Sequence, residues 1–137
     1  MAALTKDRNT PSREGNDFSY PVAASVKCLA GGIAVLDAAG NVKPAVTATG
    51  LVTVGRFEAT VDNSSGAAAV VNAPVQRGVF QFANSAAGDA ITKAEIGDTC
   101  YLVDDQTVAK TNGTNTRSAA GTIVDVDSAG VWVRMGI

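Results

Sequence analysis

Short apolar runs alternate with polar turns along most of the chain, from Tyr20 to the C-terminus. Val, Ile and Thr number 36 in all, and these β-branched residues favour a pleated sheet because their χ1 angle is restricted. Gly, Asn, Asp and Ser separate the runs, as they do between strands. The pattern predicts strands at residues 22–28, 33–37, 42–46, 51–61, 70–76, 78–83, 99–103, 107–111, 121–126 and 131–135.

The connections between these runs have residues that suit tight turns. Residues 37–40 read DAAG and residues 127–130 read DSAG, with Gly where a hairpin loop needs a positive φ. One helical turn is predicted near residues 92–97, because Thr92 and Glu95 form a capping box and Gly97 suits the C-terminal end. We therefore expect a mainly β chain that forms a small β-barrel or β-sandwich, with this single helical turn.

The N-terminal segment differs from everything after it. Residues 5–19 are polar and charge-balanced, are broken by Pro11 and Gly15, and follow neither a helical nor a strand period. Such a segment cannot bury enough apolar surface to offset the entropy of ordering it alone. We predict an extended N-terminal arm at residues 1–19 and a single β domain at residues 20–137. The arm is either a frayed tail or a segment that becomes ordered against a partner.

Composition adds a constraint on stability. Ala and Val supply 24 and 18 residues of an apolar fraction of 46%, so large core side chains are few. A thin core predicts marginal stability as a monomer, which self-association or binding to a partner would raise. The net charge is −2 and the 11 Lys and Arg residues are scattered singly, so no patch suited to a nucleic-acid backbone stands out.

Residues suited to catalysis or metal binding are scarce. The chain has no His, and its two cysteines, Cys28 and Cys100, form no Cys-x-x-Cys pair. Residues 50–57 place two Gly at the separation of a phosphate-binding loop, but Arg56 and Phe57 replace its Lys and hydroxyl residue. We expect that segment to be a strand, both cysteines to be buried and inert, and the protein to have no catalytic, cofactor or metal site.

Two further patterns have both a structural and a functional interpretation. Asp104–Asp105 and the pair Asp125 and Asp127 are candidate carboxylate pairs, but both stand at predicted turns, where Asp is a common turn residue. Phe80 and Phe82 share one face of a strand, which could stack nucleic-acid bases. Since few basic residues flank them, we expect them to pack in the core.

Nothing in the sequence predicts a membrane segment. The apolar stretches are far shorter than the roughly 18 residues of a spanning helix. The first residues carry charges and lack the apolar core of a signal peptide. We expect synthesis in the cytoplasm, reduced thiols and no membrane partner.

The order of several segments resembles a known family. The segments at 30–40, 50–58, 61–64, 77–80, 94–108 and 121–134 follow one another as in the cement, or head decoration, proteins of tailed bacteriophages, over about residue 9 to the C-terminus. The resemblance implies a virion structural protein, made in the host cytoplasm, that binds the outer surface of the capsid. It would stabilise contacts between subunits of the major capsid protein. By the same analogy it would be a homo-oligomer, a trimer in preference to a dimer.

The resemblance makes the arm the candidate contact with the capsid, although it identifies no residue there individually. Arginines can pair with carboxylates and an aromatic residue can anchor an interface. The candidate contact residues are Arg8, Asn9, Thr10, Pro11, Arg13, Asp17 and Phe18. Three alternatives remain open: a tail or connector component of the virion, a small-barrel module that binds nucleic acid, and an enzyme that uses carboxylates and a metal.

Overall fold

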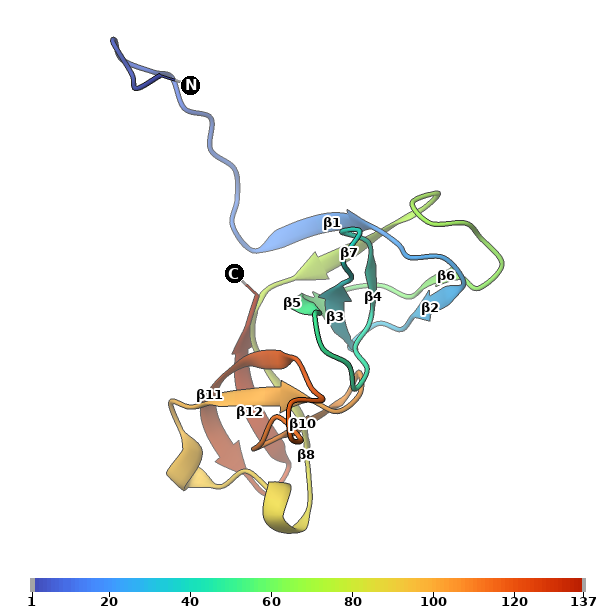
Figure 1. The fold of residues 1–137 in the computed structure, drawn as a ribbon, viewed down its shortest axis with the longest axis vertical. Helices are drawn as coiled ribbons and strands as arrows, with labels where there is room; N and C mark the ends of the chain where they lie inside the picture. Colours follow the sequence, from blue (N-terminus) through green and yellow to red (C-terminus); the bar gives the residue numbers. More distant parts are fainter. Residues whose placement is uncertain (1, 137) are drawn as a thin grey trace.

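The computed structural model describes residues 2–136 and is mainly β, with 44% of residues in strands and 4% in helices. The predicted fold class, including a small barrel, is therefore confirmed. The first seven strands form a five-stranded sheet and a two-stranded ribbon, and the last five strands form the barrel (Figure 1). The strands are β1 (Asp17–Pro21), β2 (Val26–Cys28), β3 (Ile33–Leu36), β4 (Val42–Pro44), β5 (Val52–Phe57), β6 (Val61–Asn63), β7 (Asn72–Gln76), β8 (Gly78–Asn84), β9 (Thr99–Leu102), β10 (Thr107–Ala109), β11 (Ala119–Asp127) and β12 (Gly130–Met135).

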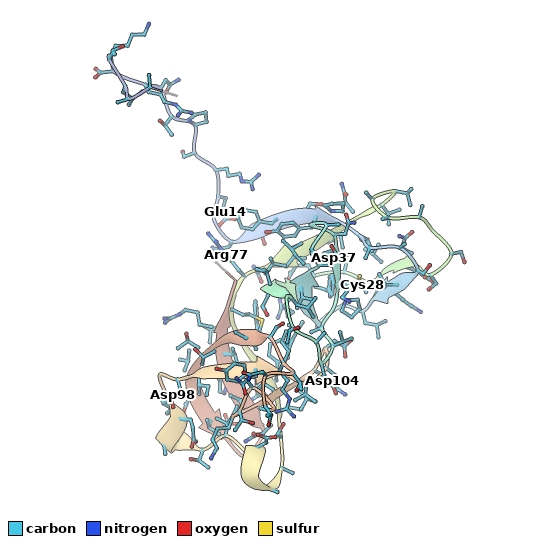
Figure 2. The ribbon with its side chains drawn as sticks, in the orientation of Figure 1. Glu14, Cys28, Asp37, Arg77, Asp98 and Asp104 are labelled. Atoms are coloured by element: carbon cyan, nitrogen blue, oxygen red, sulfur yellow. The ribbon has the colours of Figure 1, made fainter. Side chains whose placement is uncertain are left out.

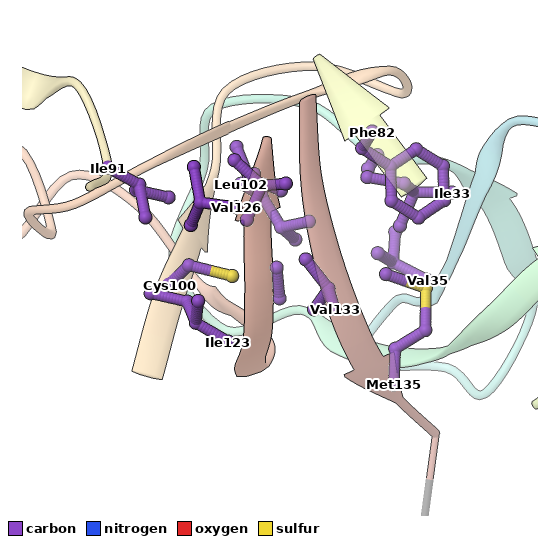
Figure 3. Packing of buried hydrophobic residues seen from close by; sticks show 14 residues of the cluster. Ile33, Val35, Phe82, Ile91, Cys100, Leu102, Ile123, Val126, Val133 and Met135 are labelled. Carbon is purple, nitrogen blue, oxygen red and sulfur yellow. The ribbon is translucent and has the colours of Figure 1, made fainter. Parts of the chain in front are cut away.

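The barrel closes five strands in the order β10-β8-β12-β11-β9. Its best predicted part, the final hairpin, is β11 and β12 joined by residues 127–130. Asp127 accepts hydrogen bonds from the amides of Ala129 and Gly130, which stabilises that turn. Figure 3 shows the apolar side chains that converge inside, among them Leu102, Ile123 and Val133, all at most 1% exposed. Closure leaves the barrel without a free edge.

The sheet has the strand order β1-β7-β5-β3-β4 and separates two cores. In β3, Ile33 and Val35 belong to the cluster inside the barrel, whereas Ala34 between them belongs to the second cluster. Successive side chains of a strand point to opposite faces, so β3 is buried on both. Phe57 is the largest side chain of the second core and is 1% exposed.

Two predicted strands are interrupted, because the chain turns inside each. Only the end of the segment predicted at 22–28 is a strand, β2, while Val22 makes an isolated bridge to Val42. The segment predicted at 51–61 divides into β5 and β6, because a bend at residues 58–60 redirects the chain from the sheet to the ribbon. Apolar periodicity alone does not mark such a change of sheet.

The helical turn is confirmed as a 3₁₀ helix, η2 (Lys93–Glu95), with the predicted capping box between Thr92 and Glu95. A second one, η1 (Ala87–Asp89), has no side-chain cap and was not predicted. It places the Asp89 carboxylate against the Thr111 hydroxyl and the Arg117 guanidinium, 3.2 Å from Nη1. These contacts connect the loop after β8 with the loop before β11.

Both cysteines are buried and free, as predicted, and they belong to different cores. Desolvation raises the pKa of the Cys28 thiol to about 11 and that of Cys100 to about 12. Both shifts favour the neutral thiol, whereas the thiolate is the nucleophilic form of cysteine.

Candidate functional site

The N-terminal arm extends away from the rest of the molecule (Figure 1). Residues 2–14 are all exposed and contain no helix or strand. Four of the predicted contact residues lie in the outer part of this segment, residues 2–12: Arg8, Asn9, Thr10 and Pro11. The arm ends earlier than predicted, because β1 begins at Asp17 and pairs with β7. Residues 17–19 were assigned to the arm and are part of the sheet; their polarity concealed an edge strand.

The other predicted contact residues gather at the base of the arm. Phe18 is half-buried and stacks on Tyr20, with 6.2 Å between ring centroids. The guanidinium carbons of Arg13 and Arg77 lie 4.8 Å and 5.1 Å from the centroid of the Phe18 ring. Arg77 Nε also donates to the carbonyl oxygen of Gly15. Cation–π contacts and this hydrogen bond therefore hold the base of the arm, while its outer residues have no such contacts.

Glu14 determines where the arm leaves the sheet. Its carboxylate accepts hydrogen bonds from the amides of Asn16 and Asp17, at 2.8 Å to 2.9 Å. These bonds, first that from Asp17, lower the pKa of Glu14. Figure 2 shows Glu14 and Arg77 side by side where the free arm begins.

The outer edge of β1 is largely closed to a further strand. Ser19 lies opposite Pro74, which has no N–H, so the backbone groups of Phe18 and Tyr20 form the hydrogen bonds to β7. The backbone N–H and C=O groups of the odd-numbered residues of β1 therefore point away from β7, toward the open edge. Of these outward groups, the amide N–H of Asp17 already donates to the Glu14 carboxylate, and Pro21 has no N–H. Such devices protect edge strands from pairing.

A groove runs along the junction of the sheet and the barrel, and we name it the seam groove. Its central hollow, about 540 Å³, includes Arg56, Val79, Phe80 and Trp132 in its lining. The Arg56 guanidinium carbon lies 4.2 Å from the centroid of Phe80, and its Nη2 lies 2.7 Å from the Glu58 carboxylate. Phe82 is buried as predicted, whereas Phe80 is only partly buried and has Arg56 over its ring.

The seam groove continues at both ends with opposite charge. Toward the arm, Val79 also lines a hollow of about 260 Å³ that contains Arg77 and Arg134. In the other direction, Gly31 joins the centre to a hollow of about 330 Å³ lined by Leu29 and Asp105. The sequence analysis did not identify this groove, because its residues come from β5, β7, β8, β12 and several connecting segments. No periodic pattern joins positions so far apart.

The acidic pairs behave as ordinary turn and surface residues. Asp104 accepts from the amide of Gln106 at 2.9 Å, and Asp125 pairs with Lys93 Nζ at 2.9 Å. Asp127 accepts from Trp132 Nε1 at 3.0 Å, and this bond lowers its pKa. Between residues 2 and 136, no three Cys, Asp or Glu side chains are grouped so that they could hold a metal ion. Within the same part of the chain, no helix is long and apolar enough to span a membrane.

Comparison with known proteins finds no family model, no curated protein and no solved structure that matches this chain.

Proposed function

We propose that the protein is a structural component of a phage virion that binds the outer surface of the head and stabilises contacts between major capsid protein subunits. The observation that carries the proposal is the free arm on a folded β domain. The eleven outer residues, 2–12, reach at most about 40 Å when extended, which is enough to contact a neighbouring subunit. An arm that becomes ordered on binding adds contact area to a small domain.

Charge supports a protein partner with an acidic surface. Residues 2–13 carry Lys6, Arg8 and Arg13 against the single acidic residue Asp7, although the whole chain has a net charge of −2. The arm is thus more basic than the rest of the chain. Arginine pairs with carboxylates through charge-assisted hydrogen bonds, so we expect acidic residues on the capsid surface that the arm crosses. The proposed role is structural and requires neither catalysis nor a cofactor.

The primary experiment mixes the purified protein with undecorated mature heads of its own phage, pellets them, and counts the copies bound per major capsid subunit. Saturation at a fixed ratio near one is the expected result for a decoration protein. No binding, or only a few copies per particle, would overturn the proposal in favour of a tail or connector component.

The contribution of the arm is measured with a deletion of residues 2–13. The deletion keeps Glu14, because its carboxylate holds the start of β1, and removes no residue of the sheet. We expect a thermal midpoint lowered by no more than a few degrees, because only the exposed contact of Arg13 with Phe18 is lost from the domain. The affinity for heads should be lowered about tenfold, as for the loss of a few charge-assisted contacts. Arg8→Gln with Arg13→Gln should reproduce most of the loss, and Ser12→Ala is the matched arm control. Equal affinity of the deletion variant and the full chain would exclude the arm as the capsid contact.

We also propose self-association, as a trimer rather than a dimer, to supplement the Ala- and Val-rich core. Sedimentation equilibrium over a range of protein concentrations measures it directly. A monomer at every concentration would contradict this part of the proposal.

A further inference from the structure

The seam groove combines features of a peptide-binding surface. Its three hollows adjoin one another, because neighbouring hollows share Val79 and Gly31. Arginines line the end beside the arm, and Asp105 lines the far end. The centre combines apolar and aromatic side chains with the polar side chains of Arg56, Gln76 and Gln81. Two partly exposed apolar residues of adjacent strands, Val79 at 42% and Trp132 at 36%, face outward there.

We propose that the seam groove binds an extended, acidic polypeptide segment of the partner, with a carboxylate at Arg134 and Arg77 and an apolar side chain over Val79 and Trp132. The inference rests on the proposed function, since it assigns that segment to the major capsid protein. The groove would thus be a second contact with the capsid, in addition to the arm, and it lies directly beside the base of the arm.

The arginine end can accept an anion. Arg134 is exposed on the outer face of β12, opposite Val79 of β8. No carboxylate of residues 2–136 forms an ion pair with Arg134 or Arg77. Arg77 is oriented by Gly15 and Phe18, so it contributes fixed charge beside the more accessible Arg134. A carboxylate placed between them would gain charge-assisted hydrogen bonds.

The centre of the groove is preorganised for an apolar side chain. Trp132 is held by its hydrogen bond to Asp127, and Arg56 is fixed between Glu58 and the Phe80 ring. An aromatic residue that is already oriented loses little side-chain entropy when a partner covers it. Partly exposed Trp next to Arg is typical of the residues that dominate binding energy in interfaces.

Other occupants fit less well. The arm of a second copy would bring Arg8 and Arg13 to the arginine end, where like charges repel. A nucleic-acid strand would need a continuous track of basic side chains and several stacking faces, whereas the groove has Arg77 and Arg134 at one end and the partly exposed ring of Trp132 at its centre. A segment that added to the sheet at β1 would meet the blocked amide of Asp17. The mixed charges of the groove favour a polypeptide with charges of its own.

The first test uses the emission of Trp132, which is the only tryptophan and lies in the groove. Poly-L-glutamate, a flexible chain of carboxylates, is titrated into the full protein at low salt. We expect a saturable change of emission that poly-L-lysine does not produce, with an affinity about tenfold lower in Arg134→Glu. Lys27→Glu, an equal charge change at an exposed position of β2, is the matched control and should behave as the unmodified protein.

The outcomes of the titration decide the proposal. No change of emission, or an equal change in Arg134→Glu and the unmodified protein, would overturn it. A stronger response to a single-stranded oligothymidylate than to poly-L-glutamate would reassign the groove to nucleic acid and overturn it also.

The second test repeats the sedimentation with undecorated heads. Arg134→Glu should bind about tenfold more weakly than the unmodified protein, while Lys27→Glu binds normally. If all three bind equally, the proposed function stands and the groove is not the contact. If the unmodified protein does not bind heads while the titration succeeds, the proposed function fails and the groove remains a site for acidic peptides.

Discussion

Replacing Phe57 by Ala tests whether the two cores form one cooperative unit. Phe57 is 1% exposed in the core between the sheet and the β2–β6 ribbon, whereas Trp132 lies on the barrel. The cores meet at β3, whose Ile33 and Val35 face one and whose Ala34 faces the other. Loosening the second core therefore withdraws support from a wall of the first. We predict that Phe57→Ala lowers the stability of the barrel as well.

The magnitude follows from the burial of the ring. Phe→Ala in a closed core costs about 4 kcal/mol, the transfer free energy of the lost atoms plus the cavity left behind. With a urea m-value of about 2 kcal/mol per molar, the unfolding midpoint should fall by about 2 M. The thermal midpoint should fall by about 12 °C. Such a loss is a large part of the total stability of a domain of this size.

Urea unfolding is followed by two signals, the fluorescence of Trp132 for the barrel and far-ultraviolet circular dichroism for the whole chain. Both should report the same lowered midpoint. The control is Val52→Ala on the same strand, where the side chain is 48% exposed and the expected change is below about 0.5 kcal/mol. A Trp132 midpoint that stays at its original value, while the circular dichroism shows a separate early transition, would refute the coupling through β3.

Four further outcomes are expected. Gly121→Ala should cost about 2 kcal/mol in thermal unfolding, because its Cβ would lie 2.2 Å from the carbonyl oxygen of Arg134 on the neighbouring strand β12, while Gly88→Ala, with open space around it, should be neutral. Thr92→Ala should cost about 1 kcal/mol by removing the capping box, and Thr92→Ser should recover most of it; equal midpoints for both variants would contradict this. Native protein should not react with a thiol reagent at pH 8 and should release both thiols on unfolding, because desolvation raises both thiol pKa values; rapid labelling of the native protein would contradict their burial. The thermal midpoint should be flat near pH 6 and fall as pH drops from about 5 to 3, because six carboxyls have a lowered folded-state pKa: Glu14, Asp62, Asp89, Glu95, Asp125 and Asp127. Such a carboxyl stabilises the fold above its unfolded-state pKa of about 4 and loses that contribution as pH falls through the folded-state pKa. A midpoint that is constant down to pH 3 would refute this.

Local signals in the sequence predicted the parts of the fold that local physics decides. Alternation located most of the strands, and the final hairpin was predicted within a few residues because β11, its turn and β12 are consecutive. The capping box at Thr92 was visible for the same reason, since its partners lie three residues apart. The strand β1 was missed because it is an edge strand whose Asp17 and Ser19 side chains are exposed to solvent, where polar side chains carry no desolvation cost.

The candidate site divides in the same way. Composition alone indicated a polar arm, and the absence of His and of Cys-x-x-Cys pairs limited the chemistry available to the chain. The contact of Arg77 with Gly15 joins residues 62 positions apart, and no local pattern predicts it. The seam groove likewise depends on the tertiary structure, because the chain passes from β7 of the sheet directly to β8 of the barrel, where β8 pairs with β12.

The sequence by itself determined that this is a β protein with an exposed arm, because strand period, turn residues and the balance of apolar burial against entropy act over short stretches. Only the tertiary structure decided which strands closed into the barrel, that β3 separates two cores, and that Arg134, Trp132 and Arg56 border one groove. Those features depend on pairings between distant segments, and the free energy of such pairings comes from packing that exists only once the whole chain is folded.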